Sequence, residues 1–477
     1  MANDVTFNRV PAETQARWRL VRQVCEESRA LRDQLPTLNA ADTSEANRAR
    51  NAAYKDRAVF YGVTGFTLLG LLGLAFRKDP IVDTAVFTDR MASLIYNVDG
   101  ANTSIFQQAQ QALANVLQVG RHGLLADFEG NADQAVIKAY KAEDILNWRT
   151  EQTLAGDRLV MLVLREEYEK EAEYSIESEV RYREFRLIEG QCIVRVWEHD
   201  ADGKLVMVSE APISPRTGRV IDFIPFVFIG SQTNNHQIDG APLHRLATVN
   251  LAHYRNSADY EDSVFFVGQA QPYIAGLTDE WRDWLAGKDE NGVARVYWGS
   301  RMPILLPQGG MAGMVQPTPN ILVREAMDQK EAHMIALGAR LIQGGVGART
   351  ADQSRGERES STSALAMCCA NVSEAYQTVI KFAGVLVDKV VPPESDTFLI
   401  NQEFVEQSAD PQTMAQLVGM WQSGVIAKAD IRDWLRSRGT LDSERTNEEI
   451  EGDIEAEGPN LALVGVDDGD GERAASK

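Results

Sequence analysis

The sequence predicts a mixed α and β protein of the α+β class, built from several parts. Two regions, residues 10–120 and 243–391, repeat apolar side chains every three or four positions, which is the helical period. Residues 157–229 instead alternate apolar and polar side chains, the pattern of half-buried strands. At 477 residues, with 44% hydrophobic and 25% charged side chains, the chain has ordinary globular composition and length for about two to four domains.

The N-terminal part predicts four helices. Pro36 ends the first, Ser44 is a candidate N-cap for the second, and Gly120 is a natural stop for the last. The expected helices cover residues 13–35, 43–57, 89–98 and 103–120.

Residues 59–76 (VFYGVTGFTLLGLLGLAF) carry no charge over 18 positions, which is near the lower length limit of a membrane span. Four glycines interrupt this run, and charges flank it on both sides. Because glycines allow close packing, the segment favours a buried helix or helix–strand element over a membrane anchor.

The alternating region predicts a small β-rich lobe packed on the N-terminal helices. Its expected strands cover residues 158–164, 182–188, 191–199 and 204–208. Residues 200–203 (DADG) supply a tight turn, and residues 165–179 form either an exposed turn or a long hairpin.

The most informative stretch reads as helix, compact insert, helix, polar loop and helix. It comprises residues 243–264, 265–320, 322–342, 344–359 and 363–391. The insert holds turn formers and three of the eight Trp, and the last helix is apolar on most faces. This layout suits a part that spans a distance and presents a loop.

The sequence of the C-terminal part predicts a helical portion, residues 411–438, followed by a tail from residue 443. Residues 411–438 resemble a helix–turn–helix, but few basic side chains face outward together, which favours a packing unit over DNA readout. From residue 443 onward the chain is acidic and poor in aromatics, so we expect disorder.

The formal charge of −21, from 69 acidic and 48 basic side chains, argues against a protein that grips nucleic acid. It leaves open a surface along which DNA slides. The four cysteines contain no CxxC pair and predict small core residues in a reducing compartment. No apolar run follows a basic N-terminus, so we expect no secretory signal and a cytoplasmic location.

No motif for catalysis is found. HExxH, GxxxxGK[ST] and GxSxG are all absent, and 69 carboxylates give no way to choose an acid–base pair. We therefore expect no catalytic, cofactor or metal site. The loop 344–359 is either a solvated surface loop or a flexible segment that touches a polyanion. Its hydrogen-bonding side chains include Arg349, Thr350, Gln353, Arg355 and Arg358.

Several stretches together carry a resemblance to bacteriophage portal proteins. They are residues 54–80, 225–230 (PFVFIG), 242–262 (PLHRLATVNLAHYRNSADYED), 268–276 (GQAQPYIAG) and the run from 338 to 366. Their order and spacing, rather than any single motif, make the chain similar to this family. The glycines within residues 344–347 would make the loop 344–359 unusually mobile, and this puts its contact with DNA in doubt.

The resemblance implies a portal architecture: a helical wing with a β-rich lobe, a helical stem, an α/β clip and a helical crown. The implied parts are the wing 1–240, stem helices 241–264 and 321–343, clip 265–320, tunnel loop 344–360, wing helix 361–400, crown 401–442 and acidic tail 443–477. Arg349, Thr350, Gln353, Arg355 and Arg358 would lie at the DNA channel.

The resemblance also implies a function and partners. Portal proteins form a ring, usually of about twelve identical subunits, at one capsid vertex of the virion, after assembly in the host cytoplasm. Double-stranded DNA passes through the channel during packaging and ejection. The terminase large subunit, head–tail adaptor proteins and the major capsid protein or scaffold would be partners, without a membrane or cofactor.

Three alternatives stay open from the sequence. The first is another head–tail connector or capsid-vertex structural protein. The second is a hydrolase with an unrecognised carboxylate pair. The third is a membrane-associated protein anchored by residues 59–76.

Overall fold

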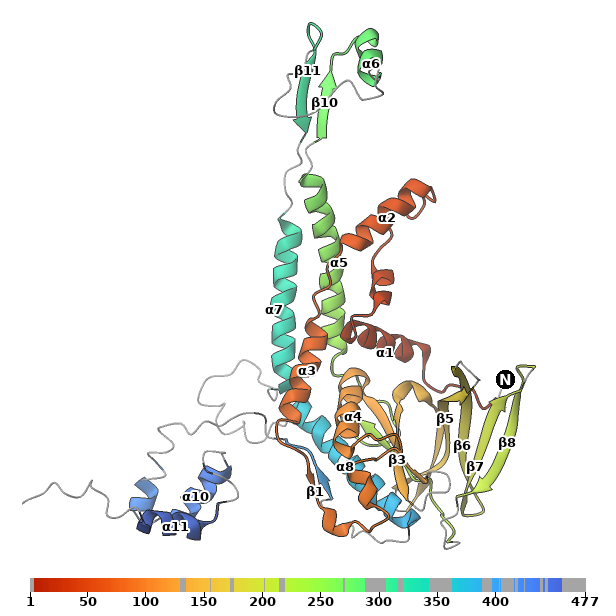
Figure 1. Ribbon diagram of the computed structural model, residues 1–477, viewed down its shortest axis with the longest axis vertical. Coiled ribbons are helices and arrows are strands. Elements are labelled where there is room, and N and C mark those ends of the chain that lie inside the picture. Colours follow the sequence, from red (N-terminus) through yellow and green to blue (C-terminus); the bar gives the residue numbers. More distant parts are fainter. Residues whose placement is uncertain are drawn as a thin grey trace, which may run out of the picture. The chain divides into compact units, whose positions relative to one another are not determined.

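A computed structural model of the chain has the mixed α and β character that the sequence predicts (Figure 1). It describes residues 4–128, 134–154, 156–171, 176–200, 202–213, 219–268, 271–287, 306–315, 321–342, 363–387, 397–402, 404, 416, 419–423, 425–437, 441 and 445–456. The chain divides into two compact units, Met1–Gln402 and Glu403–Lys477.

The N-terminal helices differ in part from the expectation. They are α1 (Ala12–Cys25), α2 (Glu45–Arg57), α3 (Val63–Ala75) and α4 (Ile105–Val119). The expected helix 13–35 is wrong, because Glu27 adopts a positive φ of 51° and Ser28 caps a separate 3-10 helix, Arg29–Gln34. The expected helix 89–98 is also wrong, since only the 3-10 turn Ala92–Ile95 forms there.

Two predicted helix ends are confirmed. The Ser44 hydroxyl accepts a hydrogen bond from the Asn47 backbone at the start of α2. At the end of α4, Gly120 adopts a left-handed φ of 74°, and a Cβ there would lie 2.6 Å from the Gly240 carbonyl oxygen. Glycine is therefore required at this stop.

A three-stranded antiparallel sheet lies under α8 (Ala364–Leu386). Its order is β3–β2–β9, with β2 (Arg121–Phe128) in the centre between β3 (Ala135–Lys141) and β9 (Phe226–Gly230). All five residues of β9 are buried. The sequence did not predict β3.

A five-stranded antiparallel sheet forms the β-rich lobe, in the order β4–β5–β6–β7–β8. The strands are β4 (Ile145–Thr153), β5 (Gly156–Glu171), β6 (Ile176–Ile188), β7 (Gln191–His199) and β8 (Leu205–Pro212). Residues 165–171 and 176–179 belong to the long antiparallel pair β5–β6, which agrees with the expected long hairpin. At the turn before β8, the Asp200 carboxylate accepts hydrogen bonds from the Asp202 and Lys204 backbones.

The β-rich lobe contacts the N-terminal helices as expected. The Arg9 backbone donates to the Leu146 carbonyl at 2.8 Å. The Arg22 guanidinium on α1 donates through two nitrogens to Glu143, which precedes β4. These contacts fix the lobe beside α1.

A long helix pair and a third, buried helix complete the first unit. α5 (His244–Val267) and α7 (Leu322–Ile342) lie side by side (Figure 1). α8 buries most of its residues against the three-stranded sheet and α4, which confirms the deep packing expected of it. The strands β1 (Ile81–Val82) and β12 (Phe398–Leu399) pair near its end.

The insert between α5 and α7 has a small α/β structure. β10 (Gln271–Ala275) and β11 (Met311–Val315) pair antiparallel, and α6 (Asp279–Ala286) follows β10. The Thr278 hydroxyl caps α6 by accepting from the Trp281 backbone. Residues 288–305 lie outside the described residues.

The second unit contains α10 (Lys428–Ser437) and α11 (Asn447–Ala456). α11 corrects the expectation of a disordered tail from residue 443. The reason is a reciprocal cap, in which Thr446 accepts from the Glu449 backbone and Glu449 accepts from the Thr446 backbone. The Arg432 guanidinium of α10 pairs with Glu451 of α11 at 2.9 Å.

Buried charges join the two sheets of the first unit. Arg183 on β6 pairs with Asp127 on β2 at 2.7 Å and with Glu166 on β5 at 3.2 Å. The Tyr140 hydroxyl on β3 also donates to Glu166. Burial raises the pKa of Glu166, but Arg183 and other hydrogen-bond donors outweigh it and leave this pKa lowered.

We expect Arg183→Gln to lower the free energy of unfolding by about 3 kcal/mol, because it removes the shared cation from two partly buried carboxylates. Urea denaturation measures this. Arg149→Gln, on an exposed position of β4, is the control and should change stability by less than about 0.5 kcal/mol. Equal effects of the two variants would contradict the role given to Arg183.

Candidate functional site

The residues predicted to contact DNA, Arg349, Thr350, Gln353, Arg355 and Arg358, lie outside the described residues. The structure describes the helices on either side of them. α7 ends at Ile342, and α8 begins after Ser363, whose hydroxyl caps it by accepting from the Ala366 backbone. The helix pair α5–α7 leads into this loop and forms the described part of the candidate site.

One polar contact ties the two helices of the pair together. The His253 imidazole on α5 lies 3.2 Å from a Glu331 carboxylate oxygen on α7. His253 is 2% exposed, and Met334, one turn further along α7, is 1% exposed. Met334 is the one residue of α7 that is fully buried within the described part of the chain.

Hydrogen bonds of the Asn250 side chain hold the glycine-rich helix α3 against α5. The Asn250 side-chain oxygen accepts from the Thr64 backbone at 3.0 Å and from the Thr64 hydroxyl at 2.8 Å. Its amide nitrogen donates to the Tyr61 carbonyl at 2.7 Å. On another side, Gly65 permits the close approach of α3 to α1, because a Cβ there would lie 2.7 Å from the Cys25 carbonyl oxygen.

These contacts show that α5 and α7 run in opposite directions. α3 binds the first half of α5 through Asn250 and lies beside the second half of α7, where Met334 and Ile342 face Val63 and Leu74 across a groove. The start of α7 therefore lies at the level of the end of α5.

At that end of α5, a second set of contacts attaches α2. Asp262 forms ion pairs with Arg50 and Arg57 of α2. Between these two arginines on α2, the Tyr54 hydroxyl donates a hydrogen bond to the Asp259 carboxylate of α5 at 2.7 Å. The two guanidinium groups also cover aromatic rings, Arg57 over Phe265 at 4.2 Å and Arg50 over Phe266 at 4.7 Å.

The charges of this attachment shift the pKa of Asp262. Burial alone would raise it, but hydrogen bonds from Arg50 and Arg57 outweigh burial and lower it below its usual value. The Asp262 side chain is 14% exposed, against 33% for Arg50 and 24% for Arg57. The pairs are therefore partly shielded from solvent and stronger than surface pairs.

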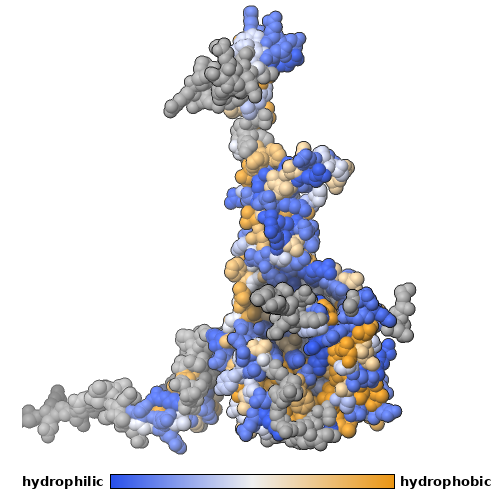
Figure 2. Space-filling model, turned by 45° about the vertical axis from the view of Figure 1, so that its right-hand side comes forward, coloured by the Kyte–Doolittle hydropathy of each residue, from blue (hydrophilic) through white to orange (hydrophobic). Residues whose placement is uncertain are grey.

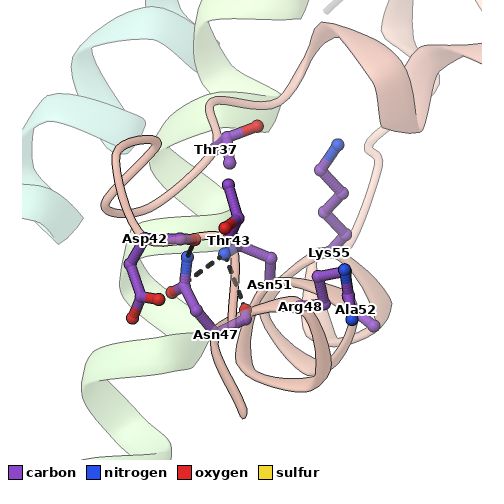
Figure 3. A pocket seen from close by; sticks show the side chains of 8 residues that line it. All are labelled: Thr37, Asp42, Thr43, Asn47, Arg48, Asn51, Ala52 and Lys55. Carbon is purple, nitrogen blue, oxygen red and sulfur yellow. Dashed lines mark hydrogen bonds between the residues drawn. The ribbon is translucent and has the colours of Figure 1, made fainter. Parts of the chain in front are cut away.

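A polar hollow of about 410 Å³ lies on another side of α2 (Figure 3). Its lining is formed by Thr37, Asp42, Thr43, Asn47, Arg48, Asn51, Ala52 and Lys55. Asn47 and Asn51 hold the preceding loop, since both amides donate to the Leu38 carbonyl and the Leu38 backbone donates back to Asn51. The wall of the hollow is thus fixed by hydrogen bonds between asparagine side chains and the backbone of Leu38.

An apolar groove of about 460 Å³ lies between α3 and α7. It has no charged lining residue, and it is formed by Val63, Thr67, Gly70, Leu71, Leu74, Met334, Ile335, Gly338, Ala339 and Ile342. Beside it Phe66 is 70% exposed and Ile335 is 71% exposed. Figure 2 shows hydrophobic residues gathered along the helix pair.

Residues Val63–Ala75 of the segment 59–76 form the helix α3 as expected, but this helix is only partly buried, because Phe66 and Leu69 are 70% and 65% exposed. Within the described ranges, no helix has the length and apolar character needed to cross a membrane. Cys192, Cys368 and Cys369 are buried as expected, and Cys25 is partly so; all four are free thiols. In the same ranges, no three His, Cys, Asp or Glu side chains gather as a metal site would require.

Residues 242–385, from the start of α5 into α8, match a protein family described as a domain of unknown function (DUF4055). No curated protein matches the chain.

Three solved structures similar to the chain come from gene transfer agent (GTA) particles, each at 12% sequence identity. The neck of an empty particle, computed with C6 symmetry, gives a TM-score of 0.40 over 80% of this chain and 92% of the other. The virion of a native particle gives 0.40 over 78% and 89%. The neck of a native particle, computed with C12 symmetry, gives 0.38 over 79% and 90%. Scores of this size do not by themselves assign a function.

The attachment of α2 to α5 and the hollow beside α2 were both missed by the sequence analysis. Arg50 and Arg57 are seven positions apart and share one face of α2, which is a readable signal. Their partner Asp262 is more than 200 positions away, and no local pattern points to it. The hollow depends on the path of residues 37–43, which periodicity does not describe.

We expect Asp262→Asn to lower the free energy of unfolding at pH 7 by about 1–3 kcal/mol, between the values for exposed and buried pairs. Because the pKa of Asp262 is lowered in the folded state, its contribution is present above the unfolded value of about 3.9. The contribution should shrink as the pH falls through the folded value. Urea denaturation between pH 7 and about pH 3 measures this.

Asp283→Asn is the matched control, because Asp283 pairs with Arg282 on α6 while 76% exposed. It should change stability little at any pH. A pH-independent effect of Asp262→Asn would contradict the electrostatic account of the α2 attachment.

Proposed function

We propose that this chain is a portal-type head–tail connector of a tailed bacteriophage. Copies of it would form a ring at one capsid vertex, through which double-stranded DNA passes during packaging and ejection. The ring would also dock the terminase large subunit and, later, head–tail adaptor proteins. The proposal assigns no catalytic, cofactor or metal site to the chain.

The observation that carries this proposal is the antiparallel helix pair that brackets a separate α/β insert. α5 has 24 residues and α7 has 21, so at about 1.5 Å per residue they extend about 36 Å and 32 Å. Such a pair supports the roles of stem for α5–α7 and clip for β10, α6 and β11. The loop after α7 then falls where a tunnel loop is expected.

The surface of the pair supports assembly into a ring. α7 exposes Ile335, Leu322 and an apolar groove, although a helix of this length gains most of its stability from packing. Uncovered apolar surface of this kind marks an interaction site. In a closed ring, every subunit would cover such a face on its neighbour.

The charge of the chain supports a conduit for DNA. A net charge of −21 disfavours tight binding of phosphates, whereas three loop arginines supply weak, replaceable contacts. Many strong cationic contacts would hold DNA in place. A channel needs to let it move.

Negative-stain electron microscopy of the purified protein tests the ring. We expect top views with a central hole and a particle mass of about twelve times the 52.8 kDa chain. Compact monomers or dimers that persist at high protein concentration would contradict the proposal.

Replacing Arg349, Arg355 and Arg358 together by Gln tests the role of the loop. We expect rings to form as in the wild type, while the amount of DNA packaged or retained falls, because the weak phosphate contacts are lost. Nuclease-protected DNA per particle is the measurement, with Arg149→Gln on exposed β4 as the control. Loss of ring assembly would mean that these arginines are structural instead.

A further inference from the structure

We propose that the hollow beside α2 binds the carboxylates Glu325 and Asp328 at the start of α7 of a second copy of this chain. The contact would be made by Arg48 and Lys55. The inference rests on the proposed ring and names one subunit contact within it.

The cations of α2 divide into two groups. Arg50 and Arg57 are paired with Asp262 on α5, as described above. The side chains of Arg48 and Lys55 form neither a hydrogen bond nor an ion pair with any described residue, and both line the hollow. They lie seven positions apart on α2, two helical turns along one face. The two cations therefore stand at one site without an ion-pair partner among the described residues.

The hollow is shaped to admit an acidic side chain. Ala52, between the two cations, contributes only a methyl group to the lining, and Thr37 and Thr43 contribute hydroxyls (Figure 3). Asp42 is the one acid in the lining. Its carboxylate accepts from the Ser44 backbone at 2.9 Å, and in Figure 3 it lies on the far side from Lys55. Two cations against one engaged carboxylate leave the site positive.

The first turns of α7 carry matching carboxylates. Glu325 and Asp328 are exposed, lie one helical turn apart, and form no ion pair within the described residues. The same helix has a single fully buried residue in the described structure, Met334, and its surface continues into the apolar groove with α3. This part of α7 is therefore uncovered, and it carries two carboxylates against one exposed cation, Arg324.

The two charged sites lie at one level but on opposite sides of α5. The start of α7 and the attachment of α2 both lie at the C-terminal end of α5. His253, which contacts α7, and Asp262, which contacts α2, are nine positions apart, so at about 100° per residue they point about 180° apart. Figure 1 shows α2 and α7 on either side of α5.

This placement identifies the occupant as a second copy. Within one copy, α5 separates the hollow from the acidic face of α7. Between neighbours in a head-to-tail ring, the α2 side of one copy meets the α7 side of the next, at the same level. Opposite charges at such an interface fix orientation and speed association.

Charge reversal on each side tests the contact. The variant Arg48→Glu with Lys55→Glu and the variant Glu325→Lys with Asp328→Lys should each raise the concentration for half-maximal ring assembly at least about tenfold. Sedimentation velocity and negative-stain microscopy measure assembly, and far-ultraviolet circular dichroism verifies folding. The control Arg149→Glu with Lys204→Glu makes the same net charge change as the first of these variants, at exposed positions on β4 and just before β8, and should assemble as the wild type does.

Mixing the two defective variants is the decisive step. In a ring in which the two variants alternate, there are two kinds of interface. One joins the reversed α2 of the first variant to the reversed α7 of the second, and the other joins two native surfaces. Opposite charges therefore meet at both. We expect rings from the mixture although neither variant forms them alone.

The outcomes separate this contact from the ring itself. Normal assembly of both reversed variants, or no recovery on mixing, would overturn the contact while leaving the ring in place. If the wild type forms no ring at any concentration, the proposed function fails and the contact fails with it.

Discussion

The α5 helix must satisfy different partners on opposite faces, and the rest of the first unit depends on how it does so. Asn250 holds α3 near one end, His253 meets α7, and Asp262 draws in α2 near the other end. Each is a polar side chain that adds a directional contact to the apolar packing of the helix. Directional bonds of this kind define a rotation and a register for the helix, which nonspecific burial does not.

The sequence predicted those elements whose determinants are local. α7 and β7 have the expected bounds, and Ser44 and Gly120 act as caps because one side chain or one backbone conformation is enough. The break after α1 was missed because it depends on a positive φ at Glu27, a residue that does not favour one. β3 was missed because its burial arises largely from α8, more than 200 positions away in the chain.

The candidate site shows the same division. Apolar periodicity predicts the helix pair, and turn residues predict the insert, so the order of these elements could be predicted from the sequence. The hollow at Arg48 and Lys55 was not, since it requires residues 37–43 to be folded back by Asn47 and Asn51. In the second unit, composition alone suggested disorder at α11, but a cap between Thr446 and Glu449 is enough to begin a short helix.

In the proposed ring, the bare face of α3 would have a consequence for the subunit before it assembles. α3 is apolar around its whole circumference, and Phe66 and Leu69 are 70% and 65% exposed. A free subunit would therefore expose an apolar surface that favours nonspecific association as its concentration in the cell rises. A net charge of −21 makes two randomly oriented copies repel each other at long range. The acidity of the chain thus acts as colloidal protection, which only a correctly oriented encounter overcomes.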